Sequence, residues 1–139
     1  MGLIGYIETH PRIRRTFDEI DRKIDPLKEL QYLLVELEDV SLATNELNKG
    51  AIYKFQSFLE KAFHSDLMKI DDYNEIRKDF DELVSYLNRI IELRKQGKKD
   101  EEIEFYETVY NPLYESLLGK LRYLEYYHIL ATPAYRIFV

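Results

Sequence analysis

The sequence predicts an all-α fold, specifically an antiparallel up-and-down four-helix bundle with a short extra helix at the N-terminus. Apolar residues recur every three or four positions along most of the 139-residue chain, which is the period of one helix face. No short alternating run is bounded by Gly or Pro, and no Asn-Gly or Asp-Gly pair marks a hairpin, so strand signals are missing. A length of 139 residues with 45% hydrophobic side chains suits one domain. We therefore expect a single helical domain over residues 1–139, with short links between its helices.

The first helix is expected over residues 16–24. Thr16 and Glu19 form a capping box, in which Thr16 accepts a hydrogen bond from a free helix N–H and Glu19 reaches back toward the cap. Because a proline inside a helix removes a backbone hydrogen bond, this short helix should stop before Pro26.

The second helix is expected over residues 26–48. Asp25 is a favourable N-cap, and Pro26 is tolerated at the first helical position, where an N–H would have no helical partner. Gly50 is the expected left-handed terminator of this helix. The apolar face consists of Leu27, Leu30, Leu33, Leu34, Leu37, Val40 and Leu47.

The third and fourth helices are expected over residues 51–70 and 72–96, with Asp71 and Asp72 supplying the N-cap between them. The third carries Ile52, Phe55, Leu59, Ala62, Leu67 and Ile70 at nearly helical spacing. The fourth has the most regular pattern in the chain: Tyr73, Ile76, Phe80, Leu83, Leu87 and Ile90 are separated by 3, 4, 3, 4 and 3 positions. This heptad pattern is typical of helices that pack at about 20° in bundles.

The last helix is expected over residues 101–131, after a cap at Asp100. Pro112 lies inside this stretch and should kink or break the helix near Tyr110, since it has no N–H. Pro133 closes the helix. The predicted core stripe is Ile103, Tyr106, Tyr110, Leu113, Leu117, Leu121, Leu124, His128 and Ala131.

Composition excludes several classes of site. The chain has no cysteine, so it cannot form disulfides, thiolate zinc sites or a cysteine nucleophile. Its start lacks a basic segment followed by an apolar run of about 7–15 residues, and no stretch approaches the roughly 18 apolar residues that span a bilayer. We expect a cytoplasmic protein that does not enter a membrane. Abundant Glu, Lys, Arg, Ile and Tyr resemble the composition of thermophile proteins.

The last helix is unusually rich in tyrosine, and we expect it to carry a protein-binding surface. Tyr106 and Tyr110 fall on the core stripe, whereas later tyrosines drift away from it. Tyrosine is enriched at protein interfaces, and the C-terminal segment AYRIFV is apolar enough to pack against a protein surface. The function expected first is therefore non-enzymatic protein binding, most simply to a second copy of the chain. The expected interface residues are Tyr114, Tyr123, Tyr127, Tyr135, Ile137 and Phe138.

Glu125 and His128 form Glu-x-x-His, the spacing by which di-iron bundle proteins hold metal. Such a site needs two of these pairs and two further glutamates. Neither His10 nor His64 lies three residues after a glutamate, so the count fails. We expect no metal and no cofactor.

A second function, from a different class, depends on Arg122 and His128. Their Arg-x5-His spacing resembles the Arg-x4-6-His motif of the HEPN family of helical-bundle ribonucleases. The resemblance implies a dimer in which the two residues, from each of two copies, cleave RNA without metal. Tyr123 stands where that family often has a polar Asn or Asp after the arginine. A HEPN-like ribonuclease, or an inactive relative, is thus one alternative.

A third function is association with nucleic acid through the basic cluster of Arg12, Arg14 and Arg15. The overall charge opposes it, because the chain carries a net charge of −6. The tyrosine-rich segment 101–139 also holds six acidic and three basic side chains, whereas base-stacking platforms come with a positive groove.

Overall fold

The computed structural model describes the backbone of residues 11–131 and the side chains of residues 22–131. Over this range the protein is all-helical, and none of these residues forms a strand. The elements are α2 (Pro11–Thr44), α3 (Lys49–His64), α4 (Ile70–Lys95), α5 (Lys99–Phe105), the π-helix η1 (Tyr106–Tyr110) and α6 (Asn111–Leu130). The predicted all-α class is confirmed.

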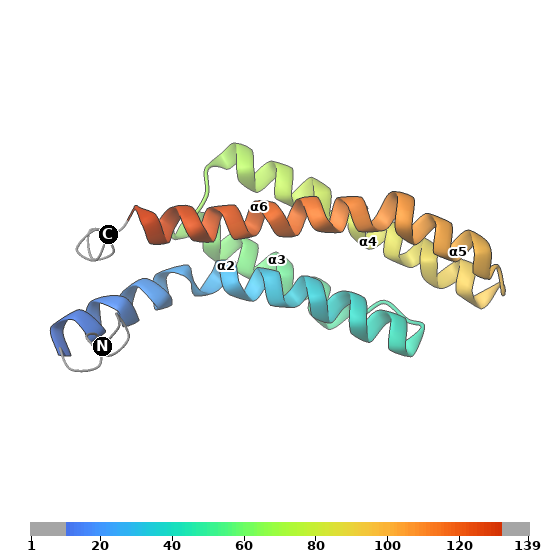
Figure 1. The fold of residues 1–139 in the computed structure, drawn as a ribbon, viewed down its shortest axis with the longest axis horizontal. Coiled ribbons are helices and arrows are strands. Elements are labelled where there is room, and N and C mark those ends of the chain that lie inside the picture. Colours follow the sequence, from blue (N-terminus) through green and yellow to red (C-terminus); the bar gives the residue numbers. More distant parts are fainter. Residues whose placement is uncertain (1–10, 132–139) are drawn as a thin grey trace, which may run out of the picture.

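The long helices lie side by side along the molecule (Figure 1). α2 contacts both α3 and α6, and α4 contacts α3, α5, η1 and α6. α5, η1 and α6 follow one another without a break and form one rod that returns along α4 and α2. The N-terminal part of α2 and the C-terminal part of α6 therefore lie at the same end of the molecule, at the left of Figure 1.

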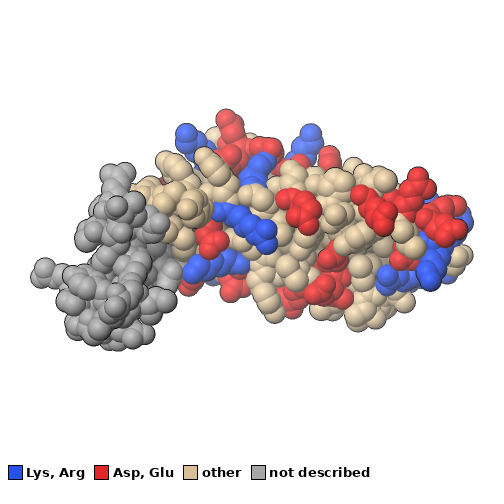
Figure 2. All heavy atoms as spheres, viewed as in Figure 1, with Lys and Arg blue, Asp and Glu red and all other residues tan. Residues whose placement is uncertain are grey.

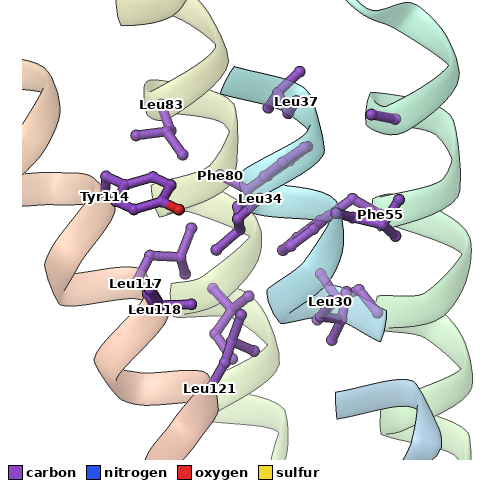
Figure 3. Close-up of a cluster of buried hydrophobic side chains, with 14 of the residues drawn as sticks. Leu30, Leu34, Leu37, Phe55, Phe80, Leu83, Tyr114, Leu117, Leu118 and Leu121 are labelled. Atoms are coloured by element: carbon purple, nitrogen blue, oxygen red, sulfur yellow. The ribbon is translucent and has the colours of Figure 1, made fainter. Parts of the chain in front are cut away.

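The core lies where α2, α3, α4 and α6 meet. Figure 3 shows leucines of α2 and α6 gathered around Phe55 of α3 and Phe80 of α4, whose rings stack with centroids 3.8 Å apart and planes 6° from parallel. The heptad residues predicted for α4 are all buried, each with at most 8% of its surface exposed: Tyr73, Ile76, Phe80, Leu83, Leu87 and Ile90. The prediction of this face is confirmed. On the other predicted helices, the core positions Val40, Ile70 and Ile103 were wrong, because these side chains are 39%, 53% and 45% exposed.

The helix break predicted at Pro26 does not occur, and the separate helix 16–24 is instead part of α2. Pro26 lies inside the continuous helix Pro11–Thr44. The ribbon of α2 changes direction between its dark blue and light blue parts in Figure 1. A proline inside a helix costs about 3 kcal/mol, because it removes one hydrogen bond and crowds the preceding turn. Ile24 and Leu27, on either side of Pro26, are both buried in the same core, and this burial holds the two segments in one helix.

Pro112 does not break the last helix either, because a π-helix precedes it. In η1 the Asn111 N–H bonds the Tyr106 carbonyl, five residues back rather than four. The additional residue in this turn shifts the hydrogen-bonding register just before the proline, so α6 continues with Pro112 in its first turn. The expected kink is therefore replaced by a local widening of the helix.

The turn after α2 uses a residue that sequence reasoning did not select. α2 ends at Thr44, and Asn45, with φ of 56°, adopts the left-handed conformation that was expected of Gly50. Gly50 instead lies in the first turn of α3, where the Asn48 side chain accepts a hydrogen bond from the Ala51 N–H at 3.2 Å. Asparagine can take this conformation because its short polar side chain bonds locally.

Candidate protein-binding surface

The tyrosines of the last helix fall into two groups, and the members of the first are buried or half-buried. Tyr106, Tyr110 and Tyr114 stack along η1 and α6, with ring centroids 5.4 Å and 6.0 Å apart. Tyr110 is fully buried, and Tyr114 is 8% exposed. Tyr114, expected at the interface, is thus part of the core in this structure, and we leave it out of the candidate surface. We call these three residues the inner tyrosine stack.

A carboxylate of α2 lies against the inner tyrosine stack. The Tyr106 hydroxyl donates a 2.7 Å hydrogen bond to Glu38 Oε1. Removal from water raises the pKa of Glu38, and the hydrogen bond from Tyr106 partly opposes that rise. Burial also raises the pKa of all three tyrosines, so their hydroxyls remain protonated at neutral pH. The Tyr110 hydroxyl has no hydrogen-bond partner among the described residues. These contacts stabilise the fold and offer no exposed site.

The second group of tyrosines is exposed and forms a stripe on the outer side of α6. Tyr123, Tyr126 and Tyr127 are 68%, 60% and 54% exposed, and Leu130 is 39% exposed. These positions follow the i, i+3, i+4, i+7 pattern of one helix face, while Leu117, Leu121 and Leu124 occupy the buried face. We call the four residues the outer stripe. Tyr126 and Leu130 were not predicted as interface residues, although counting three and seven residues on from Tyr123 would have included them.

A groove of about 880 Å³ lies beside the outer stripe. One wall is α6, with Tyr123, Tyr127 and His128; the other is the α3–α4 loop and the first turn of α4. Its apolar lining combines the buried Leu67, Met68 and Leu124 with Ile70, which is 53% exposed. An apolar concavity with exposed aromatic residues on its rim is a surface that protein segments can fill.

His128 connects the two walls of this groove. Its Nε2 lies 2.8 Å from the carbonyl oxygen of Leu67 in the α3–α4 loop, and its ring meets that of Tyr127 edge to face at 5.4 Å. Asp66, in the same loop, has φ of 58°, the left-handed conformation in which the chain leaves α3. His128 therefore positions the loop relative to α6.

The groove is acidic on its outer rim. Asp66, Asp71 and Asp72 line it, opposed by Lys69 among the lining residues. By contrast, the surface over the C-terminal end of α6, next to the grey atoms in Figure 2, carries mostly uncharged side chains. The site thus combines an apolar, tyrosine-rich wall with an acidic rim.

Two other residues singled out from the sequence, Arg122 and Glu125, also lie on α6. Arg122 is exposed, and it lies close enough to Tyr114 for its charge to lower the pKa of that hydroxyl against the effect of burial. The ribonuclease alternative, which needs Arg122 and His128 together, stays a prediction. Glu125 accepts a 2.8 Å hydrogen bond from the Gln31 side chain in α2.

Several predicted residues lie outside the region whose side chains are described. These are Tyr135, Ile137 and Phe138 of the expected interface and Arg12, Arg14 and Arg15 of the basic cluster. Among the residues that are described, no three His, Asp or Glu side chains are grouped so as to hold a metal ion. No helix in the described part of the chain is both long and apolar enough to cross a bilayer.

Comparison with known proteins returned nothing: no family model matches the chain, and neither a curated protein nor a solved structure matches it significantly.

Proposed function

We propose that this protein acts by binding protein through the outer stripe of α6, and that the partner is a second copy of the same chain. In this proposal the helices form one up-and-down antiparallel bundle that serves as a rigid support, and the protein works in the cytoplasm without a catalytic step. The observation that carries it is the exposure of Tyr123, Tyr126 and Tyr127 on one face of a helix whose opposite face is buried.

Burial in the core does not explain the exposed tyrosines on this face, although the Tyr127 ring also contacts His128. Their rings do not contribute to the core, and tyrosine forms helices less readily than the Lys, Glu or Leu common elsewhere in the chain. Tyrosine gives a large contact area at low entropic cost, since its side chain has only two rotatable angles, and its hydroxyl can pair at the edge of an interface. A twofold contact would bring the same stripe from two copies together.

The test is the mass of the protein in solution, measured by size exclusion with light scattering at several concentrations. The wild-type chain should run above its monomer mass of 16.8 kDa, and Tyr123→Ala/Tyr127→Ala should shift it toward the monomer. The matched control is Tyr32→Ala/Tyr53→Ala, which removes two tyrosines that are 62% and 79% exposed on other helices. A wild-type chain that stays monomeric up to millimolar concentration refutes self-association. An equal response of the two double variants refutes the assignment to α6.

A further inference from the structure

We propose that the groove beside the C-terminal end of α6 receives residues 134–139 of a second copy of this chain. This inference rests on the proposed self-association and names the segment that completes the contact. The segment, AYRIFV, begins four residues after the last residue of α6 and lies outside the described residues.

The outer stripe alone offers less area than a stable contact needs. The three tyrosines of the outer stripe, at 54–68% exposure, offer about 350–400 Å² if each ring presents about 200 Å² when fully exposed. A stable interface covers about 800 Å² on each partner. The outer stripe alone therefore supplies about half of that, and the remainder must come from surface next to it. The groove is that surface, because Tyr123 and Tyr127 belong to both.

The groove and the tail segment 134–139 also match in polarity and charge. The groove has an apolar lining that includes Ile70 and an acidic rim with Asp71 and Asp72. The tail has three large apolar side chains, Tyr135, Ile137 and Phe138, and its one charged side chain, Arg136, is basic. In an extended segment successive side chains point to opposite sides. Tyr135 and Ile137 would then face the groove together, while Arg136 and Phe138 lie on the outer side, with Arg136 near the acidic rim.

The backbone at the end of α6 bears on which copy supplies the tail. Where the chain turns within the described residues, Asn45, Asp66 and Gly97 take the left-handed conformation. Ala131 does not: it continues the right-handed helical conformation, with φ of −75° and ψ of −7°, and its N–H bonds the Tyr127 carbonyl. Within the described residues, therefore, the chain does not turn back toward its own groove.

A second copy placed stripe against stripe brings its groove within reach of this tail. His128 lines the groove and lies only three residues, or about 5 Å of helix, before Ala131. The eight residues after Ala131 extend over at most about 26–29 Å. In a twofold contact each tail enters the groove of the other copy, so both grooves are filled by the same interaction.

The experiment uses the absence of cysteine from the chain. Two full-length variants, Ile70→Cys and Ile137→Cys, are mixed under mild oxidation and analysed on a non-reducing gel and by mass spectrometry. The expected product is a disulfide between residue 70 of one chain and residue 137 of another. A mixture of Tyr53→Cys with Ile137→Cys is the control, because residue 53 is more exposed than residue 70 but does not line the groove. An equal yield in both mixtures overturns the proposal.

The double variant Ile70→Cys/Ile137→Cys separates the two possible sources of the tail. If the tail fills the groove of its own chain, this variant forms a disulfide within one monomer and the mixture gives no cross-link, which overturns the proposal. Ile137→Asp in the full chain should weaken dimerisation at least about tenfold in sedimentation experiments, since a buried isoleucine is lost. Unchanged dimerisation of Ile137→Asp overturns the tail contact but leaves the outer stripe as the interface, whereas a monomeric wild type overturns both proposals.

Discussion

Replacing Tyr110 by phenylalanine is expected to stabilise the protein, although tyrosine and phenylalanine differ by one hydroxyl. The Tyr110 side chain is fully buried, and its hydroxyl has no hydrogen-bond partner among the described residues. A buried polar group without a partner costs about 1–3 kcal/mol. Phenylalanine removes that cost and keeps the ring stacked between Tyr106 and Tyr114.

The cavity left by the hydroxyl is too small to reverse this sign. One oxygen atom leaves a void of roughly 10–15 Å³, which costs about 0.3 kcal/mol at about 24 cal/mol per Å³. The net gain for Tyr110→Phe is therefore about 1 kcal/mol. For a chain of this length that raises the melting temperature by about 3–4 °C.

Tyr106→Phe is the matched control, because it removes a hydroxyl that does have a partner. It leaves the half-buried Glu38 carboxylate without its 2.7 Å donor, and hydrogen bonds to charged groups contribute about 1.5–3 kcal/mol. We expect a loss of about 1–2 kcal/mol. Both variants are measured by urea unfolding at pH 7, followed by far-UV circular dichroism. If Tyr110→Phe is destabilised by more than 1 kcal/mol, the hydroxyl has a partner and the reasoning is wrong.

Three further predictions concern other parts of the fold. Burial raises the pKa of Glu38, so the folded protein binds a proton at this carboxyl more tightly than the unfolded chain does. The stabilisation from this proton is complete below the unfolded pKa of 4.5, and it is lost as pH rises through the raised pKa of the folded state. Glu38→Gln should therefore melt higher than wild type at pH 7, and the difference should shrink toward pH 4; a pH-independent difference would contradict this. Arg94 donates hydrogen bonds to the end of α2 and to a carboxylate of α5, so Arg94→Ala should cost about 2 kcal/mol in urea unfolding. Arg89→Ala, whose ion pair is half exposed, should change stability by less than about 0.5 kcal/mol. Gly97 has φ of 72°, so Gly97→Ala should lower stability by about 1–2 kcal/mol, whereas Gly119→Ala, in a helix with no atom within 4 Å of the added Cβ, should raise it by about 0.5–1 kcal/mol. Equal shifts for the two glycines would show that backbone conformation does not decide their effect.

The parts of the fold that were predicted correctly depend on local spacing. The face of α4 could be read from Tyr73 to Ile90, because a straight helix keeps residues three and four apart on one side. The helix boundary at Pro26 was wrong for a reason that local rules do not contain. The burial of Ile24 in a core shared with helices far along the chain keeps the segment before the proline in the same helix.

The burial of Tyr114 was missed by the sequence prediction, although Tyr106, Tyr110 and Tyr114 are spaced four residues apart. The prediction extended an α-helical stripe from Tyr106 through Tyr110 to Leu113. A π turn contains more residues than an α turn, so it rotates the chain less per residue. Residues four apart then come into line, which stacks Tyr106, Tyr110 and Tyr114 and leaves Leu113 half-buried. Nothing in the sequence before Pro112 announces this change of register.

The outer stripe differs from the inner tyrosine stack in what its loss should do. Removing a tyrosine ring from the inner stack leaves a cavity in the core and lowers the stability of the monomer. Removing Tyr123 and Tyr127 leaves no cavity, because more than half of each side chain is already in water. Alanine also favours the helix by a few tenths of a kcal/mol per residue. A stripe that serves only a partner therefore has a distinct signature: the substitution weakens association while the unfolding free energy of the monomer is unchanged or slightly higher.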